Sequence, residues 1–223
     1  MFLGIQSPSS TIAYPRSSSH FKVPTLSQHQ ISMVLYFENR HRFDFDFETA
    51  SLAFINRYPN PYSKHVLSVD TLESYVDKQG QLCTTRIIVK TGKLPKFIKP
   101  FLGVANLNSW IIEKSIINPR TSTLVSYTSN IDHRKFIRVE EYLKYYSEKK
   151  DNTFATGLNG TIVDSKVKFS SNLFGLKLKV EEWSHKRFTK NIQNTREGLN
   201  YVMMKLKERG RNYLTNTKRG VDV

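Results

Sequence analysis

The stretch Asn56-Arg57-Tyr58-Pro59-Asn60-Pro61-Tyr62-Ser63 decides how this chain folds, because it joins a predicted short helix to the first of several alternating strands. Pro59 and Pro61 cannot continue a helix, and each biases the preceding residue toward extended backbone. The stretch is therefore a stiff corner. Arg57 lies just before this corner, so its guanidinium is held in a defined place and suits recognition of a phosphate or a carboxylate. On this stretch alone, capping of the helix C-terminus is an equally good role for Arg57.

Upstream of the corner the pattern changes from strand to helix. The run Arg42-Phe43-Asp44-Phe45-Asp46-Phe47 alternates as a half-buried strand requires. Asp46 can then cap a helix that spans about 48 to 57. A strand followed by a short helix is predicted here.

The first 32 residues differ in composition from the rest of the chain. They hold eight serines, one Arg and one Lys, and the first acidic residue of the chain is Glu38. We expect residues 1–32 to form a disordered leader or extension. Their composition partly matches a transit peptide but lacks a sustained amphipathic period, so an upstream start in the gene model is an equal alternative.

Downstream of the corner, strand-like runs alternate with turn-forming residues. The runs are 66–75, 81–90, 110–117, 123–130, 136–146 and 154–169. Their short connections favour an antiparallel meander, and a long helix spanning about 172 to 209 follows the last run. The pattern predicts an α+β fold: a curved antiparallel sheet of about seven strands wrapped around a long C-terminal helix, with a short N-terminal helix and a lid loop. We expect one folded domain at 33–208 and a basic flexible tail at 209–223.

The composition narrows the class of protein. With 223 residues, 39% of them hydrophobic and 24% charged, the chain is long enough for one globular core. Its formal charge of +15 attracts anionic membranes or nucleic acid, and charge alone does not choose between them. No apolar run approaches the roughly 18 to 20 residues that span a bilayer, so any membrane contact is peripheral and reversible. Cys83 is the only cysteine, which excludes an intrachain disulfide and a Cys-rich zinc site, and no metal or cofactor is expected.

The predicted long helix carries an apolar face that turns polar along its length. By their spacings of three and four, one face begins with Leu173, Leu176, Val180 and Trp183. The same face continues with Arg187, Asn191 and Asn194, while the apolar positions of the second half lie on a displaced stripe. Such a polar extension is either the wet end of a core or the wall of a cavity with a charged occupant.

A second unusual segment is Lys93-Leu94-Pro95-Lys96-Phe97-Ile98-Lys99-Pro100-Phe101-Leu102-Gly103. Its two prolines interrupt both helix and strand, so it is predicted to be a loop whose apolar residues lack a sheet partner. We expect a lid in which lysines approach anionic head-groups while the aromatic rings enter the acyl boundary. The residues expected at the membrane are Leu94, Lys96, Phe97, Ile98, Lys99, Phe101 and Leu102. The alternative is an Ω-loop packed on its own core.

The corner and its continuation His65-Val66-Leu67-Ser68-Val69-Asp70-Thr71 resemble the opening signature of the PRELI family, particularly its fungal Ups-type members. Further similar segments are Lys90-Thr91-Gly92-Lys93-Leu94-Pro95, Trp110-Ile111-Ile112-Glu113, Val139-Glu140-Glu141-Tyr142, Asp164-Ser165-Lys166-Val167-Lys168-Phe169-Ser170-Ser171 and Lys179-Val180-Glu181-Glu182-Trp183-Ser184. The resemblance implies a carrier of phospholipid between the mitochondrial membranes. The most similar members move phosphatidic acid toward the inner membrane, where it feeds cardiolipin synthesis.

The same resemblance implies a location and a partner. It implies the mitochondrial intermembrane space, with peripheral and reversible binding to anionic membranes such as the inner membrane. It also implies a heterodimer with a small helical protein that carries twin Cys-x9-Cys motifs. No nucleic acid is expected.

A phospholipid carrier must enclose two acyl chains and neutralise a phosphate. Burial stabilises each methylene by about 0.8 kcal/mol, whereas a buried phosphate needs cations and donors around it. The resemblance carries over four head-group contacts by position: Arg57, Lys90, Lys93 and Arg187. His65 is a secondary candidate, and so is Asn194, where relatives carry a lysine, so one charge is missing here.

Three other functions compete with lipid transfer. An enzyme is not expected, because the chain lacks Gly-x-Ser-x-Gly, a phosphate-cradling glycine loop and His-Glu-x-x-His, so no residue is assigned a catalytic role. A nucleic-acid-binding module would use the charge of +15 with eleven Tyr and fourteen Phe, but most aromatic residues occupy core-like strand positions. A pure scaffold for the helical partner would carry no lipid. Within lipid transfer, phosphatidylserine is the alternative cargo.

Overall fold

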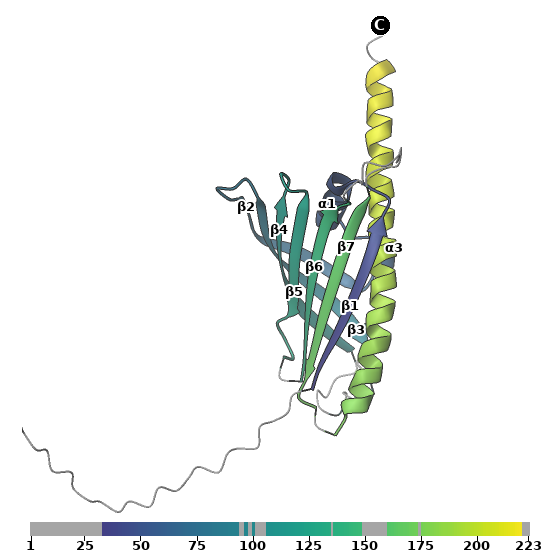
Figure 1. Cartoon of the computed structure of the whole chain (residues 1–223). Helices are drawn as coiled ribbons and strands as arrows, with labels where there is room; N and C mark the ends of the chain where they lie inside the picture. The colour runs from purple at the N-terminus through teal and green to yellow at the C-terminus, as the bar shows by residue number, and fades with distance from the viewer. Residues whose placement is uncertain are drawn as a thin grey trace, which may run out of the picture. The chain divides into compact units, whose positions relative to one another are not determined.

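The structure is a computed structural model that describes residues 33–93, 96–97, 100, 106–134, 136–148, 160–173 and 175–219. It forms a seven-stranded sheet in the order β1-β7-β6-β5-β4-β3-β2, in which every neighbouring pair is antiparallel. The elements are β1 (Met33–Phe43), α1 (Phe47–Ile55), η1 (Pro61–Ser63), β2 (Val66–Val76), β3 (Leu82–Lys93), β4 (Asn106–Asn118), β5 (Thr123–Asn130), β6 (Ile137–Ser147), β7 (Thr161–Ser171) and α3 (Lys177–Arg219). Figure 1 shows the curved sheet with α3 along it. The predicted α+β fold is confirmed.

Several element boundaries differ from those predicted. The strand predicted at 42–47 is wrong, because β1 ends at Phe43. Asp46 caps α1 as predicted, accepting the Thr49 N–H at 2.7 Å. The alternation was misleading because Phe45 and Phe47 both pack against the same core although they lie outside a strand. The strand predicted at 154–169 begins at Thr161, and residues 149–159 lie outside the described part of the chain.

The long helix is shifted relative to its predicted range. It begins at Lys177 because Gly175 adopts φ +74°, a left-handed conformation that a helix cannot include. At the other end it continues to Arg219, so the end predicted at Arg209 is wrong, and residues 209–219 are helical rather than a flexible tail. Residues 1–32 lie outside the described residues, and the division of the chain at residue 33 stays a prediction.

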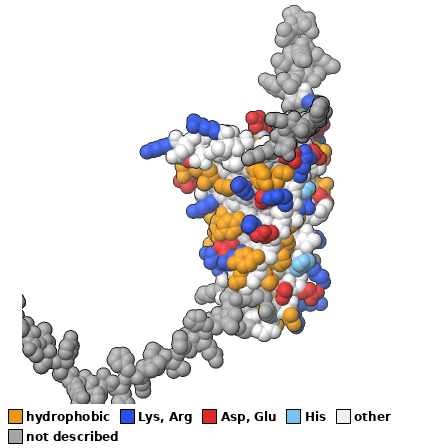
Figure 2. Space-filling view, in the orientation of Figure 1, with side chains coloured by type: hydrophobic (Ala, Val, Ile, Leu, Met, Phe, Trp, Pro, Cys, Tyr) orange, Lys and Arg blue, Asp and Glu red, His pale blue; other side chains and the backbone are white. Residues whose placement is uncertain are grey.

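The two faces of the sheet have different chemistry. Cross-strand ion pairs lie on the outer face. They include Arg40 with Asp164 at 2.6 Å and Lys166 with Glu38 at 2.8 Å. Figure 2 shows apolar side chains interleaved with Lys and Arg on this side of the molecule. Residues with the opposite alternation point toward the helices. The inner face therefore carries both the core and any internal site.

The core fills one end of the inner face. There α1 contributes Ala50, Ala53 and Phe54, all almost completely buried, and α3 contributes Leu199, Val202 and Met203. These side chains meet one row of the sheet, in which Ile117, Leu124, Tyr145 and Val163 are consecutive cross-strand partners. At the start of α3, a smaller cluster is formed by Leu173 and Val180 with Phe97, Phe136, Ile137 and Leu176. Val180 thus lies on the inward face of α3, as its spacing predicts, whereas Leu176 precedes the helix and packs in the same cluster.

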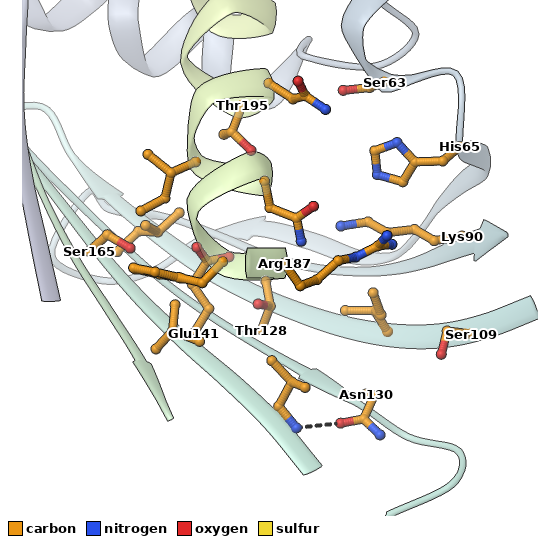
Figure 3. A pocket seen from close by; sticks show the side chains of 18 of the residues that line it. Ser63, His65, Lys90, Ser109, Thr128, Asn130, Glu141, Ser165, Arg187 and Thr195 are labelled. Carbon is orange, nitrogen blue, oxygen red and sulfur yellow. Dashed lines mark hydrogen bonds between the residues drawn. The ribbon is translucent and has the colours of Figure 1, made fainter. Parts of the chain in front are cut away.

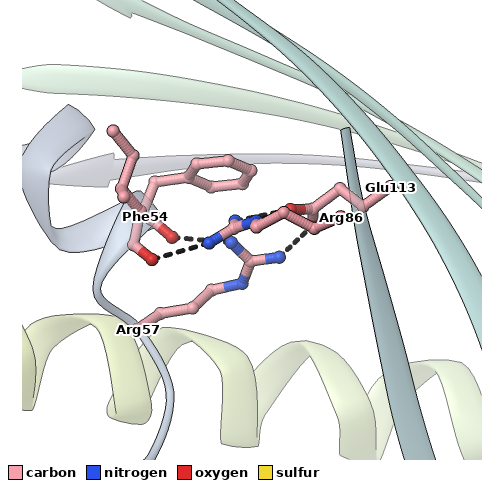
Figure 4. A network of polar contacts seen from close by, with 5 residues as sticks. Phe54, Arg57, Arg86 and Glu113 are labelled. Carbon is pink, nitrogen blue, oxygen red and sulfur yellow. Dashed lines mark hydrogen bonds and ion pairs between the residues drawn. The ribbon is translucent and has the colours of Figure 1, made fainter. Parts of the chain in front are cut away.

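A buried ion cluster ties α1 to the sheet. The Glu113 carboxylate on β4 is only 1% exposed, and it accepts hydrogen bonds from Arg86 Nε at 2.9 Å and from Arg57 Nη2. The two guanidiniums also donate to the last carbonyls of α1: Arg57 Nη1 to Phe54 O at 2.6 Å and Arg86 Nη1 to Ile55 O at 2.7 Å (Figure 4). Burial opposes ionisation of Glu113, but Arg57 and Arg86 hold its pKa below the ordinary value. The cluster satisfies carbonyls that a helix end leaves without partners.

Removal of this carboxylate charge tests the cluster. We expect Glu113→Gln to lower the free energy of unfolding by about 3–5 kcal/mol, because it leaves buried guanidinium charge uncompensated. Urea denaturation at pH 7 measures the loss. The control is Glu182→Gln, an exposed carboxylate on α3, which should change stability by less than about 0.5 kcal/mol. A loss below about 1 kcal/mol for Glu113→Gln would show that the cluster does not hold α1 in place.

Candidate functional site

A cavity of about 340 Å³ lies between the inner face of the sheet and α3 (Figure 3). Its volume falls within the range of about 300–1,000 Å³ typical of ligand pockets. Much of the wall is apolar, with Val139, Val167 and Phe169 from the sheet and Trp183 and Phe188 from α3. An apolar wall of this kind suits hydrocarbon chains.

The sheet leaves this space because side-chain size changes along its inner face. At the packed end, Leu124 and Tyr145 fill the gap between the sheet and α1. Farther along the same strands the inward positions are Thr128 on β5 and Glu141 on β6, and β7 contributes Ser165, all of which line the cavity. The short side chains of Thr128 and Ser165 on a concave surface leave a hollow that the straight helix α3 does not fill.

Among the basic side chains that line the cavity, three from distant parts of the sequence lie close to one another. They are His65 after η1, Lys90 on β3 and Arg187 on α3. An ideal Cβ atom placed on Gly92 would lie 3.6 Å from Arg187 Nη2, so this guanidinium rests against the β3 backbone next to Lys90. Burial first, then Lys90 and Arg187, lower the pKa of His65 below 6.5, and its imidazole is neutral at pH 7. The group offers two cations and one neutral hydrogen-bonding ring.

Tyr58 lies against this group of basic side chains, and the sequence did not predict a role for it in the site. Its ring lies between two cations, with Arg57 Cζ 4.8 Å and Lys90 Nζ 6.0 Å from the ring centroid. Burial opposes ionisation, but Lys90 and Arg57 lower the pKa of the phenol below 10.0. Tyr58 lines the cavity, so its side chain links the buried ion cluster to the basic group.

Arg57 is not brought to the cavity wall. The described lining does not include it, because its guanidinium is buried against Glu113 and the ring of Phe54, with Cζ 4.1 Å from the ring centroid. The alternative role as a helix C-terminal cap is the one that the structure shows. Arg57 and Arg86 together outweigh the single carboxylate of Glu113, so the cluster retains positive charge behind the basic group. Arg57 acts on the cavity through this field, and a direct contact with a head-group stays a prediction.

The polar extension of the α3 face forms cavity wall. Trp183, Arg187, Asn191 and Asn194 all line the cavity, and the charged occupant of the second alternative stays a prediction. Farther along the helix, Arg196 donates a hydrogen bond to Asn39 Oδ1 on β1, and both residues line the cavity. This contact closes the seam between α3 and the free edge of β1. Neither Arg196 nor Asn39 was predicted, because their approach depends on the path of α3 across the sheet.

The predicted lid is described only in part. Lys96 is exposed, and Phe97 is half-buried against the cluster at the start of α3. Leu94, Ile98, Lys99, Phe101 and Leu102 lie outside the described residues. The backbone of Lys93 ends β3, but its side chain is not described. The choice between a lid and an Ω-loop stays open.

The described residues lack two other kinds of feature. Within the described ranges, no group of three or more His, Cys, Asp or Glu side chains could hold a metal ion. Over the same ranges, no helix is both long and apolar enough to cross a membrane.

Comparisons with known proteins agree with this architecture. Residues 48–209 match the model of the PRELI-like family. The chain is 48% identical over 178 residues to the mitochondrial protein UPS1 of Saccharomyces cerevisiae, covering 79% of this chain and 97% of that protein. It is 44% identical over 156 residues to the ups1 homolog of Schizosaccharomyces pombe, covering 70% and 86% of the two chains. The crystal structure of TTHA0849 from Thermus thermophilus shares the fold with a TM-score of 0.50 at 11% identity, over 77% of this chain and 99% of that one.

The family match spans more than half of the chain, and the yeast relative is covered almost completely. These similarities place the protein outside the enzyme classes, as its lack of catalytic motifs predicts, and the chain belongs to the PRELI-like family.

Proposed function

We propose that this protein transfers phosphatidic acid from the outer to the inner mitochondrial membrane, in support of cardiolipin synthesis. The observation that carries the proposal is the convergence of Lys90, Arg187 and His65 on a cavity whose wall is largely apolar. One relative is named as mitochondrial and another as its homolog, which supports the location, and the resemblance of the corner supports the intermembrane space.

The cavity has the two chemistries that a phospholipid carrier needs. Its apolar wall stabilises acyl methylenes by about 0.8 kcal/mol each. Lys90 and Arg187 supply charge-assisted hydrogen bonds to phosphate oxygens, and the excess positive charge of the Arg57–Glu113–Arg86 cluster reinforces them. Because the head-group of phosphatidic acid is a phosphate alone, it needs no partners beyond the two cations Lys90 and Arg187 and the His65 ring. Phosphatidylserine, with its additional ammonium and carboxylate, is the competing cargo.

Delivery requires contact with a membrane and release from it. The exposed Lys96 and the half-buried Phe97 lie at the cavity end of the sheet, next to the start of α3. A lysine attracts anionic head-groups and a phenylalanine ring enters the acyl boundary, which gives peripheral binding. The formal charge of +15 favours the same surfaces.

A small helical partner with twin Cys-x9-Cys motifs is part of the proposal. The resemblance implies this partner, and the edge strand β2 supplies a physical reason for it. Leu67, Leu72, Tyr75 and Val76 on β2 are each more than half exposed to solvent. An exposed apolar edge strand tends to pair or aggregate unless something covers it.

Reversal of the charge on α3 tests the head-group site. We expect Arg187→Glu to lower the rate of phosphatidic acid transfer between labelled vesicles by at least about tenfold, because a repulsive carboxylate replaces a phosphate ligand. The fold should persist, because Arg187 is exposed on α3. The control is Lys205→Glu, the same type of change on the same helix outside the cavity lining. Transfer at the wild-type rate by Arg187→Glu would remove this residue from the site.

Introduction of a charge at the partly described lid tests membrane docking. We expect Phe97→Asp to lower flotation with phosphatidic acid vesicles several-fold, because a carboxylate is repelled by the anionic surface and cannot enter the acyl boundary. Binding of a short-chain, water-soluble phosphatidic acid should be retained. Phe97→Leu keeps an apolar side chain and serves as the control. If Phe97→Asp floats as well as the wild type, the segment does not dock on membranes.

A further inference from the structure

The cavity wall contains one acidic side chain among its described residues, Glu141 on β6. It points inward with Val139 and Leu143, which are two residues away on either side along the strand and also line the cavity. The next residue toward the start of the strand, Glu140, belongs to the opposite face and accepts a hydrogen bond from Tyr127 Oη at 2.7 Å. A carboxyl group among apolar residues is unexpected in a wall that serves acyl chains.

The register of the sheet places Glu141 in line with the buried ion cluster. Arg86, Glu113, Thr128 and Glu141 are consecutive cross-strand partners on β3, β4, β5 and β6. Because neighbouring strands lie about 4.8 Å apart, Glu141 is roughly 10 Å from Glu113 along this row. Glu113 has two arginine partners, whereas Glu141 forms no ion pair within 4.0 Å among the described residues.

The surroundings of Glu141 oppose a negative charge on it. On the β7 side its partner is Val167, which offers no charge. Burial raises the pKa of Glu141 above 4.5, the charges of Lys90 and Arg57 partly offset this rise, and Glu113 adds to it. Tyr145, farther along β6, keeps its phenol neutral because burial raises its pKa. Lys90, one of the two cations that favour the charged form of Glu141, is therefore also a cation that a phosphate would use.

We propose that Glu141 sets the charge that the cavity accepts: an anionic phosphate at Lys90 and Arg187 requires the protonated carboxyl of Glu141, so an anionic lipid enters together with a proton. The inference rests on the proposed function and deepens it. Two negative charges in one cavity repel each other, and both compete for the field of Lys90. Binding to the ionised form therefore adds one proton from solvent to the Glu141 carboxylate, and release of the lipid returns it.

The direction of the pH dependence follows from this linkage. The bound phosphate raises the pKa of Glu141 beyond its value in the empty cavity. Affinity is then highest below the pKa of the empty form, falls as pH rises toward the pKa of the bound form, and levels off above it. A head-group without net charge does not repel the ionised carboxylate, so its binding should show little of this dependence.

Other titrating groups in the cavity also respond to pH and must be separated from Glu141. His41, His65 and His133 line the cavity. Burial lowers the pKa of His41 and of His65, and protonation of either imidazole at low pH would also attract phosphate. Arg187 and Arg196 also line the cavity. The second ionisation of the phosphatidic acid phosphate acts in the opposite direction, because cations favour the dianion. All these groups are common to the wild type and to a variant that changes Glu141 alone.

The experiment is calorimetric titration of the purified full-length chain with short-chain phosphatidic acid from pH 5.5 to 8.5, in two buffers of different ionisation enthalpy. We expect wild-type affinity to fall about tenfold more than that of Glu141→Gln across this range, with greater proton uptake by the wild type. Glu38→Gln, the same change on the exposed outer face of the sheet, should match the wild type. Parallel pH profiles of the wild type and Glu141→Gln, within twofold, overturn the inference while leaving lipid binding intact. If the wild type binds no phosphatidic acid at any pH, the proposed function fails and the inference fails with it.

Thermal unfolding without lipid gives a second readout. Because the folded pKa of Glu141 is raised above its unfolded value of about 4.5, its contribution to stability is complete below that pH and is lost as pH rises through the folded pKa. Relative to Glu141→Gln, the wild type should lose thermal stability between pH 4.5 and 8.5. An equal difference in melting temperature at both pH values would show that Glu141 does not titrate in this window.

Discussion

The fold depends on one buried carboxylate and the two guanidiniums that neutralise it. Glu113 forms ion pairs with Arg57 from the corner after α1 and with Arg86 from β3, both beneath the first helix. Since the same guanidiniums donate to the last carbonyls of α1, this helix is fixed over one end of the sheet in position and in direction. Leu199, Val202 and Met203 of α3 then pack against α1 at that end. What α1 does not cover remains hollow, and this hollow is the cavity.

The charge of the cluster also explains why the cavity suits an anion. The two positive charges of Arg57 and Arg86 exceed the one negative charge of Glu113. Tyr58 and Lys90 lie between this excess positive charge and the cavity. Arg187 approaches from α3, so the positive groups come from the corner, the sheet and the helix. Glu141 is the one acidic side chain among the described lining residues, in a cavity that otherwise carries positive charge. A site that combines excess positive charge with one titratable carboxyl can respond to the charge of its ligand.

Sequence patterns predicted the elements and the inward face of α3, because both depend on local spacing. Alternation located most of the strands after the corner to within about four residues, although the last one begins at Thr161 rather than at 154, and the spacing from Trp183 to Asn194 identified helix positions that line the cavity. Local spacing failed at β1, where phenylalanines on both sides of Asp46 belong to one core although only Phe43 lies in a strand.

The roles of individual charges could not be predicted in the same way. Arg57 and Glu113 are 56 residues apart, and no local pattern indicates that they meet. The corner correctly suggested that Arg57 is held rigidly, but not that its partner is a carboxylate of the same chain. Alternation along β6 places the acidic Glu141 on the same inward face as Val139 and Leu143. This pattern indicates a role in the cavity only once the neighbouring strands are known.

The central claim is that a positively charged cavity in this chain holds one anionic phospholipid. Native mass spectrometry of the full-length chain, after incubation with mixed vesicles of phosphatidic acid and phosphatidylcholine, tests it most directly. The account predicts a complex of one chain with one phosphatidic acid molecule and little phosphatidylcholine. A bare chain, or equal occupancy by the zwitterionic lipid, would contradict it.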